Sequence, residues 1–386
     1  MQTAPQANKS LGNIRRTFAP WTDPSAKPMI SIRDVVKRFG GFTAVDHLSV
    51  DIFEREFFAL LGASGCGKST LLRMLAGFEQ PNEGSIILDG VDLKGMPPYR
   101  RPVNMMFQSY ALFPHMSVWD NVAFGLKQEK MAKSAIEDRV SAMLKLVKMT
   151  DFAKRKPHQL SGGQRQRVAL ARSLAKQPKV LLLDEPLGAL DKKLREETQF
   201  ELTDLQYELG LTFIVVTHDQ EEAMTMADRI AVMDKGKILQ VAPPAVVYEA
   251  PSSRFVADFI GSVNLFEGTV SKSEGQLLTI DAADGFVIET EESRKIAPGT
   301  TVWHALRPEK IAVGHEKPAG SVNAVEGEVW DLAYLGDMTI FHVKLPSGKI
   351  IKASAVNRSR SGTEVFTYHD AVWVSFAPDA GVVLES

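Results

Sequence analysis

Two kinds of hydrophobic pattern divide the chain. From residue 29 to about residue 242, short runs of aliphatic and β-branched residues alternate with longer segments of helical period. Continuous apolar runs at Val180–Leu183 and Leu211–Val216 predict strands that are buried on both faces, as parallel strands are. The stretch between them, about residues 192–209, predicts a helix that Gly210 ends. This part of the chain is therefore predicted to have an α/β fold.

A second helical region lies between residues 110 and 176. Ser134 and Glu137 have the spacing of a capping box at the start of a helix. The apolar residues that follow fall on one helical face, at Ile136, Val140, Met143, Leu144 and Val147. We therefore expect a helical subdomain at about residues 110–176, inside a domain at 29–245.

The periodicity changes after a proline-punctuated connection at residues 246–264. Alternating positions in the run Phe341–Leu345, a Pro-Ser-Gly turn and a returning run at Lys349–Val356 predict an antiparallel β hairpin. We expect a β-rich second domain over residues 265–386.

Composition excludes several classes of protein. The 386 residues are 44% hydrophobic and 24% charged, with a net charge of −2, so no global charge attracts nucleic acid or an anionic membrane. No apolar run approaches the length of a membrane span. Residues 1–28 contain four prolines and no apolar segment, which predicts a disordered tail and no signal peptide. Cys66 is the single cysteine, so the chain forms no internal disulfide.

The first candidate for chemistry is the string Gly62-Ala-Ser-Gly-Cys-Gly-Lys-Ser-Thr70, between a predicted strand and a predicted helix. Its glycines let backbone N–H groups surround phosphate oxygens at a helix N-terminus. Lys68 would reach the β- and γ-phosphates, and Ser69 would bind Mg²⁺. The alternative is a plain glycine turn, which the eight-residue spacing and the strand-loop-helix context disfavour.

Polar residues follow the two buried strands. Asp184 and Glu185 follow the first strand, at the edge of the sheet where ligands bind. Asp184 is predicted to be an outer Mg²⁺ ligand, and Glu185 is predicted to be the base that activates water. His218 ends the second and would sense or stabilise the γ-phosphate. The alternatives are an acidic pair at a helix start and a structural histidine.

A second anion site is predicted at the start of the helix that runs to about Lys176. There the Ser161 hydroxyl and the bare backbones of Gly162 and Gly163 precede Gln164. Taken alone, the string reads equally well as an N-cap with a flexible turn.

Together these strings resemble the ATP-binding subunits of ABC importers, and the resemblance extends from Met29 to the C-terminus. It implies a P-loop NTPase domain of ABC type, with the helical subdomain, followed by an all-β, OB-like (TOBE-type) regulatory domain. Gly62–Thr70 matches the Walker A loop and Val180–Glu185 the Walker B strand. Leu160–Gln164 matches the signature and His218 the switch histidine.

The resemblance also implies a role for each matched residue. Gln108 matches the Q-loop glutamine, which touches Mg²⁺ and water, and Ala189-Leu190-Asp191 matches the D-loop. Phe39 stands where the family has an adenine-stacking tyrosine, with a core phenylalanine as the alternative. The implied cis ATP contacts are Phe39, Gly62, Ser64, Gly65, Cys66, Gly67, Lys68, Ser69, Thr70 and Gln108. The implied catalytic residues are Glu185, His218, Lys68 and Gln108. The implied metal-binding residues are Ser69, Gln108 and Asp184. The residues implied to contact ATP in trans are Ser161, Gly162, Gly163, Gln164 and Asp191.

In such importers the signature of one subunit completes the ATP site of the other. The resemblance therefore implies a homodimer that binds ATP and Mg²⁺, two permease subunits, a periplasmic binding protein as an indirect partner, and a location on the cytoplasmic face of the bacterial inner membrane. The segment Tyr110–Met116 resembles the groove that receives a permease helix, although about half of its side chains are equally consistent with a core.

Cargo is implied by resemblance alone. Strings such as Phe152–Leu160 and Asp219–Met226 resemble polyamine importers of the putrescine type, with sugar, iron or sulfate importers as alternatives. A soluble ATPase acting on nucleic acid is disfavoured because residues 265–386 hold 11 Lys and Arg against 17 Asp and Glu. The signature disfavours a small-molecule kinase. A ligand- or protein-binding switch remains open for the C-terminal domain.

Overall fold

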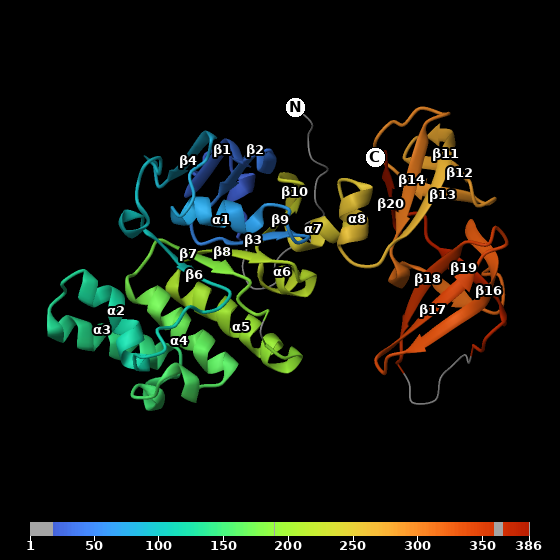
Figure 1. Ribbon diagram of the computed structural model, residues 1–386. Coiled ribbons are helices and arrows are strands. Elements are labelled where there is room, and N and C mark those ends of the chain that lie inside the picture. The colour runs from blue at the N-terminus through green and yellow to red at the C-terminus, as the bar shows by residue number, and fades with distance from the viewer. Residues whose placement is uncertain (1–17, 189, 359–365, 386) are drawn as a thin grey trace. The chain divides into compact units, whose positions relative to one another are not determined.

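The computed structural model describes residues 18–188, 190–358 and 366–385. The chain divides into two compact units between Val246 and Val247, at the beginning of the predicted connection (Figure 1). Each unit has a hydrophobic core of its own.

The first unit contains two sheets with one helix between them and further helices on the other side of the larger sheet (Figure 1). The larger sheet has the strand order β10-β9-β3-β8-β7-β6 and is parallel except for β10. Its strands are β3 (Phe57–Gly62), β6 (Val103–Met106), β7 (Val180–Asp184), β8 (Thr212–Thr217), β9 (Arg229–Asp234) and β10 (Lys237–Ala242). The smaller, antiparallel sheet contains β1 (Ile30–Phe39), β2 (Phe42–Ile52), β4 (Glu83–Leu88) and β5 (Val91–Asp92).

Helix α1 (Lys68–Ala76) lies between the two sheets, and its buried leucines share a core with both. Ile30 of β1, Leu72 of α1 and Leu182 of β7 belong to this cluster. Every residue of β3, β7 and β8 is buried, as expected of parallel strands covered on both faces. The α/β prediction is therefore confirmed.

The remaining helices of this unit are α2 (Val118–Gln128), α3 (Lys133–Leu146), α4 (Gly162–Ala175), α5 (Lys192–Leu209) and α6 (Gln220–Met226), with short 3₁₀ helices η2 (Pro98–Arg100), η3 (Thr150–Phe152) and η4 (Pro157–Gln159). Helices α3, α4 and α5 begin and end near their predicted positions, whereas α2 and α6 were not predicted. Gly210 ends α5 with a φ of 61°. The predicted capping box is wrong, since α3 already begins at Lys133. Ser134 lies inside its first turn, and Glu137 pairs with Lys133 instead.

The structure differs from the predicted tail in residues 18–28. Pro20–Thr22 form a 3₁₀ helix (η1), and the Trp21 ring lies under the Arg229 guanidinium, 4.8 Å from ring centroid to cation. Arg229 is held by the fully buried Glu56 at 2.7 Å, so it gives the aromatic ring a fixed cationic surface. Residues 1–17 lie outside the described residues.

Two five-stranded antiparallel sheets form the second unit, with one shared core. The predicted hairpin is confirmed: β17 pairs with β18, and Phe341, Val343 and Leu345 are buried. Helices α7 (Pro244–Glu249) and α8 (Arg254–Phe259) precede the sheets, and a 3₁₀ helix η5 (Pro308–Lys310) lies between their strands. The strands are β11 (Asn264–Glu274), β12 (Leu277–Ala282), β13 (Val287–Glu291), β14 (Thr301–Leu306), β15 (Ala312–Gly314), β16 (Asn323–Tyr334), β17 (Met338–Lys344), β18 (Ile350–Val356), β19 (Ala371–Phe376) and β20 (Gly381–Leu384).

His304 generates a prediction for the stability of this unit. The ring is fully buried against Phe376, with both nitrogens unpartnered, and burial lowers the pKa of His304 to about 4. As pH falls from about 6.5, the unfolded state takes up a proton that the folded state does not. The free energy of unfolding should fall by about 1.4 kcal/mol per pH unit until pH reaches the folded pKa.

Urea unfolding of the full chain between pH 7 and pH 5 measures this slope. His304→Leu should flatten it, whereas replacement of the exposed His315 by Gln should leave it unchanged. Equal slopes in His304→Leu and the parent chain would contradict a neutral buried ring.

Candidate functional site

The glycine loop connects β3 to α1, as the sequence predicts, and its backbone has no room for side chains at two positions. A Cβ on Gly62 would lie 2.4 Å from the Met233 carbonyl oxygen, and one on Gly67 would lie 2.2 Å from that of Ala44. Gly65 and Gly67 have φ values of 83° and 105°, in the left-handed region. The loop therefore requires glycine for both space and conformation.

Lys68, the first residue of α1, points its side chain back into this loop. It is 5% exposed, and its Nζ donates to the carbonyls of Gly62 at 2.7 Å and Ala63 at 2.9 Å. The buried ammonium and the N-terminus of α1 place positive charge at the same point. This arrangement suits a polyphosphate.

Ser69 joins the loop to the end of β7. Its hydroxyl donates to Asp184 Oδ1 at 3.1 Å. Burial raises the pKa of Asp184, and the nearby Glu185 carboxylate adds to this, while Ser69, Arg73 and Lys68 act in the opposite direction. Hydroxyl and carboxylate oxygens are the ligands that Mg²⁺ prefers.

No group of three or more His, Cys, Asp and Glu side chains that could hold a metal occurs among the described residues. A metal bound at Ser69 and Asp184 would therefore need further ligands from water or from a phosphate-bearing substrate, which is typical of Mg²⁺. The residues present fit such an ion.

Three predicted catalytic residues meet at the ends of neighbouring strands. Gln108 follows β6, Glu185 follows β7 and His218 follows β8. Gln108 Nε2 donates to Glu185 Oε2 at 2.7 Å, and His218 Nδ1 lies 3.3 Å from Glu185 Oε1. Each oxygen of the Glu185 carboxylate therefore has a partner, Gln108 for one and His218 for the other.

The Glu185 backbone is also fixed. Its φ is 45°, unusual for a residue with a side chain, and its N–H donates to the Val216 carbonyl at 2.9 Å. Such strained positions cluster at functional sites, where the surrounding structure holds them.

The second anion site is predicted at the N-terminus of α4, and the structure shows a capping box there. Ser161 caps α4: the Gln164 N–H donates to the Ser161 hydroxyl at 3.3 Å, and the Gln164 side-chain Oε1 accepts from the Ser161 N–H at 3.0 Å. A Cβ on Gly163 would lie 3.0 Å from Leu194 of α5. The glycines therefore let the starts of α4 and α5 approach closely.

Asp191 caps α5, since its Oδ1 accepts from the Leu194 N–H at 3.1 Å. Ala189 of the predicted D-loop lies outside the described residues. Phe39, at the end of β1, is 46% exposed, so it is not a core residue. Its ring lies 4.8 Å from Lys37 Nζ and is available for stacking.

Sequence reasoning missed the groups that hold these segments in place. Arg172 donates to the carbonyls of Tyr110 and Ala111, at 2.9 and 2.8 Å, and both of these residues have positive φ. Arg195 donates to Asp219 at 2.8 Å. In the sequence, Arg195 lies one helical turn after Asp191. Nothing in the sequence indicates that Asp219 is its partner.

Comparison with known proteins agrees with this geometry. A family model described as ABC transporter matches residues 45–188, and a TOBE domain model matches residues 304–384. A curated relative, the putrescine transport ATP-binding protein PotG of Escherichia coli K12, is 55% identical over 94% of this chain and 97% of its own. The chain belongs to the ABC transporter family. It is an ABC-type ATPase whose cassette has an ATP-binding fold.

Other members of the ABC transporter family match over similar lengths. The spermidine/putrescine import ATP-binding protein PotA of Rubrobacter xylanophilus is 55% identical over 85% of this chain and 86% of its own. PotA of Pseudomonas aeruginosa UCBPP-PA14 is 51% identical, over 92% and 98%. The β-rich second unit is the TOBE-containing part predicted from the sequence.

Solved ABC cassettes match the first part of the chain. A dimeric, post-hydrolysis state of the cassette MJ0796, bound to ADP and phosphate, has a TM-score of 0.51 and 32% identity, covering 56% of this chain and 99% of that one. CbiO1 of Clostridium perfringens has a TM-score of 0.54 and 32% identity, covering 57% and 90%. Within the described residues, all helices are too short or too polar to cross a membrane.

The tight packing of Gly67 generates a prediction. Gly67→Ala combines a positive φ with a clash against the Ala44 backbone, and strain of about 1–3 kcal/mol at this loop should weaken ATP binding by about 5- to 150-fold. Titration with a fluorescent ATP analogue measures the affinity. Gly210→Ala is the matched control, since it also has positive φ but meets only the Arg55 side chain at 3.5 Å or more. Unchanged affinity in Gly67→Ala would contradict the described loop.

Proposed function

We propose that this chain is the ATP-hydrolysing subunit of an importer for polyamines such as putrescine. The observation that carries the catalytic part is the convergence of Gln108 and His218 on Glu185, at 2.7 and 3.3 Å. The cargo is supported by relatives named for putrescine and spermidine transport that are 47–55% identical over most of this chain. Sugar, iron and sulfate importers are the alternative classes of cargo.

The cis half of the site binds the nucleotide. Phe39 stacks on adenine, the loop at Gly62–Thr70 surrounds the phosphates, and Lys68 neutralises the β- and γ-phosphates. Ser69, Asp184 and Gln108 are the residues that would hold Mg²⁺. When bound, the metal neutralises charge on the phosphates.

Glu185 is the general base of the proposed mechanism. Its carboxylate accepts a proton from the attacking water, whose oxygen then forms the bond to the γ-phosphorus as the bond to the ADP oxygen breaks. Gln108 orients the water together with Glu185. His218 holds the carboxylate in place and stabilises charge on the γ-phosphate.

The trans half comes from a second copy of the chain. Ser161–Gln164 would contact the γ-phosphate bound by the partner, and Asp191 would reach the same site. Support comes from the capped helix start at Ser161 and from the dimeric state of the similar cassette MJ0796, which is 32% identical. ATP binding then closes the dimer, and hydrolysis opens it.

Two permease subunits are the proposed membrane partners, at the cytoplasmic face of the bacterial inner membrane, with a periplasmic binding protein acting on the far side. Their docking surface lies around Tyr110–Met116. The fully buried Asn121 fixes this segment by accepting from the Phe113 N–H at 2.8 Å. Phe78, 53% exposed and 5.7 Å from the Phe107 ring, adds an exposed aromatic surface beside the Q-loop.

The second unit is proposed to regulate the transporter or to stabilise its dimer. Nucleic acid is not proposed as a partner, because acidic residues outnumber basic ones in residues 265–386, at 17 to 11.

Glu185→Gln tests the catalytic assignment. The amide keeps the size of the side chain and loses the base, so hydrolysis should fall by at least about 100-fold while ATP binding persists. Phosphate release and size-exclusion chromatography with ATP and Mg²⁺ measure turnover and closed dimer. Glu201→Gln, at a half-buried position on α5 outside the proposed site, is the control. Near-normal turnover in Glu185→Gln would remove Glu185 from this role.

The cargo has its own test. The chain, co-purified with its permeases and reconstituted in vesicles with the binding protein, should take up labelled putrescine in an ATP-dependent manner. Maltose and ferric ion should not be transported. Uptake of either of these with no uptake of putrescine would replace the proposed cargo while leaving the ATPase assignment intact.

A further inference from the structure

Arg195 connects two segments that the proposed mechanism treats separately. It lies one turn into α5, after Asp191, and its side chain reaches the start of α6, directly after His218. Its Nη1 donates to Asp219 Oδ2 at 2.8 Å, and its Nη2 donates to the Leu190 carbonyl at 3.3 Å. One guanidinium thus joins the D-loop backbone to the residue following the switch histidine.

The segment around His218 is held on both sides by this network. Asp219 uses its other oxygen, Oδ1, to cap α6 by accepting from the Glu222 N–H at 3.1 Å. Thr217, on the other side of the histidine, donates to the buried Glu222 at 2.7 Å and accepts from the Asp219 N–H at 2.9 Å. Arg195 Nε faces Glu222 Oε1 at 3.9 Å.

Partial burial strengthens the charged hydrogen bonds that Arg195 makes. The Arg195 and Asp219 side chains are 31% and 21% exposed, and that of Glu222 is 2% exposed. A charged hydrogen bond shielded in this way is stronger than a surface ion pair. The planar guanidinium can hold Asp219 and the Leu190 carbonyl at once, which a lysine ammonium does less well.

We propose that Arg195 is a positioning residue that couples the D-loop to His218. The inference rests on the proposed roles of His218 and Asp191. A displacement of Leu190–Asp191 on contact with a partner's ATP would pull on Asp219, and through it on the contact between His218 and Glu185. Each site would then hydrolyse ATP fastest when the other is occupied.

A double-mutant cycle on turnover tests the proposal in the full-length chain. Arg195→Gln should lower kcat by about 10-fold, with ATP affinity and melting temperature close to those of the parent. If Arg195 acts through His218, the same substitution should cost less than about 2-fold in a His218→Ala background. The Hill coefficient for ATP should fall towards 1 in Arg195→Gln.

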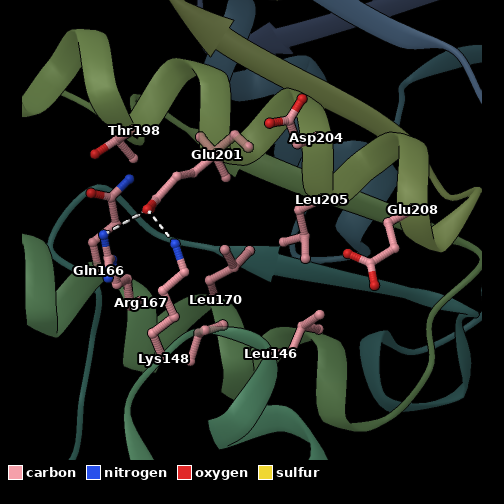
Figure 2. Close-up of a pocket in the computed structure, with 12 residues that line it drawn as sticks. Leu146, Lys148, Gln166, Arg167, Leu170, Thr198, Glu201, Asp204, Leu205 and Glu208 are labelled. Carbon is pink, nitrogen blue, oxygen red and sulfur yellow. Dashed lines mark hydrogen bonds and ion pairs between the residues drawn. The ribbon is translucent and has the colours of Figure 1, made fainter.

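Two further variants keep the test independent of folding. Asp219→Asn retains an N-cap for α6 and loses the charge pair, so it should reproduce the loss seen in Arg195→Gln. Arg195→Lys should recover part of the rate. Glu201→Gln is the matched control, because Glu201 lies on the same helix as Arg195 and forms ion pairs with Arg167 at 2.9 Å and Lys148 at 3.4 Å (Figure 2). Loss of these two ion pairs should not change kcat or the Hill coefficient.

The outcomes separate the two levels of the proposal. A normal rate in His218→Ala would remove the catalytic role of His218 and, with it, the role of Arg195. A slow His218→Ala combined with an additive loss in the double mutant would overturn the coupling alone. Parent-like kinetics in both Arg195→Gln and Asp219→Asn would also overturn it.

Discussion

The hydrogen-bond register of the buried parallel strands is the constraint on which the candidate site depends. Met106 pairs with Leu183, and Asp184 with Val216, so β6, β7 and β8 end at one edge of the sheet. β3 lies beside β8 and delivers the glycine loop to the same edge. The strands are covered on both faces, and burial of their apolar side chains, about 25 cal/mol per Å², holds the register firmly. A slip of one residue would separate the loop from Asp184 and Glu185.

This rigid edge supports backbone conformations that are unfavourable in isolation. Glu185 and Tyr110 both have positive φ, and each has a partner that holds it, the Val216 carbonyl for the first and Arg172 for the second. Such strain of about 1–3 kcal/mol persists only where the surroundings over-determine the geometry. The free energy gained by burying the sheet thus holds Glu185, the proposed base, in its unfavourable backbone conformation.

Sequence-based prediction succeeded where the signal is local. Gly210 marks the end of α5 because a left-handed C-cap favours glycine, and Ser161 is the N-cap of α4. It failed at Ser134 and at Trp21. The Ser134 spacing fits a cap, yet the helix begins earlier, and Trp21 is ordered by Arg229, which lies far along the chain.

The sequence by itself therefore determined the candidate residues and the fold class: a glycine loop, a carboxylate pair after a buried strand, a histidine after the next, and a β-rich second part. These features depend on residue type and short spacing, which one chain displays directly. Only the tertiary structure decided that Gln108 and His218 both contact Glu185, that Phe39 is exposed, and that Arg195 meets Asp219. Those contacts depend on which strands are neighbours and on how α5 and α6 pack, and neither is encoded in any single stretch of residues.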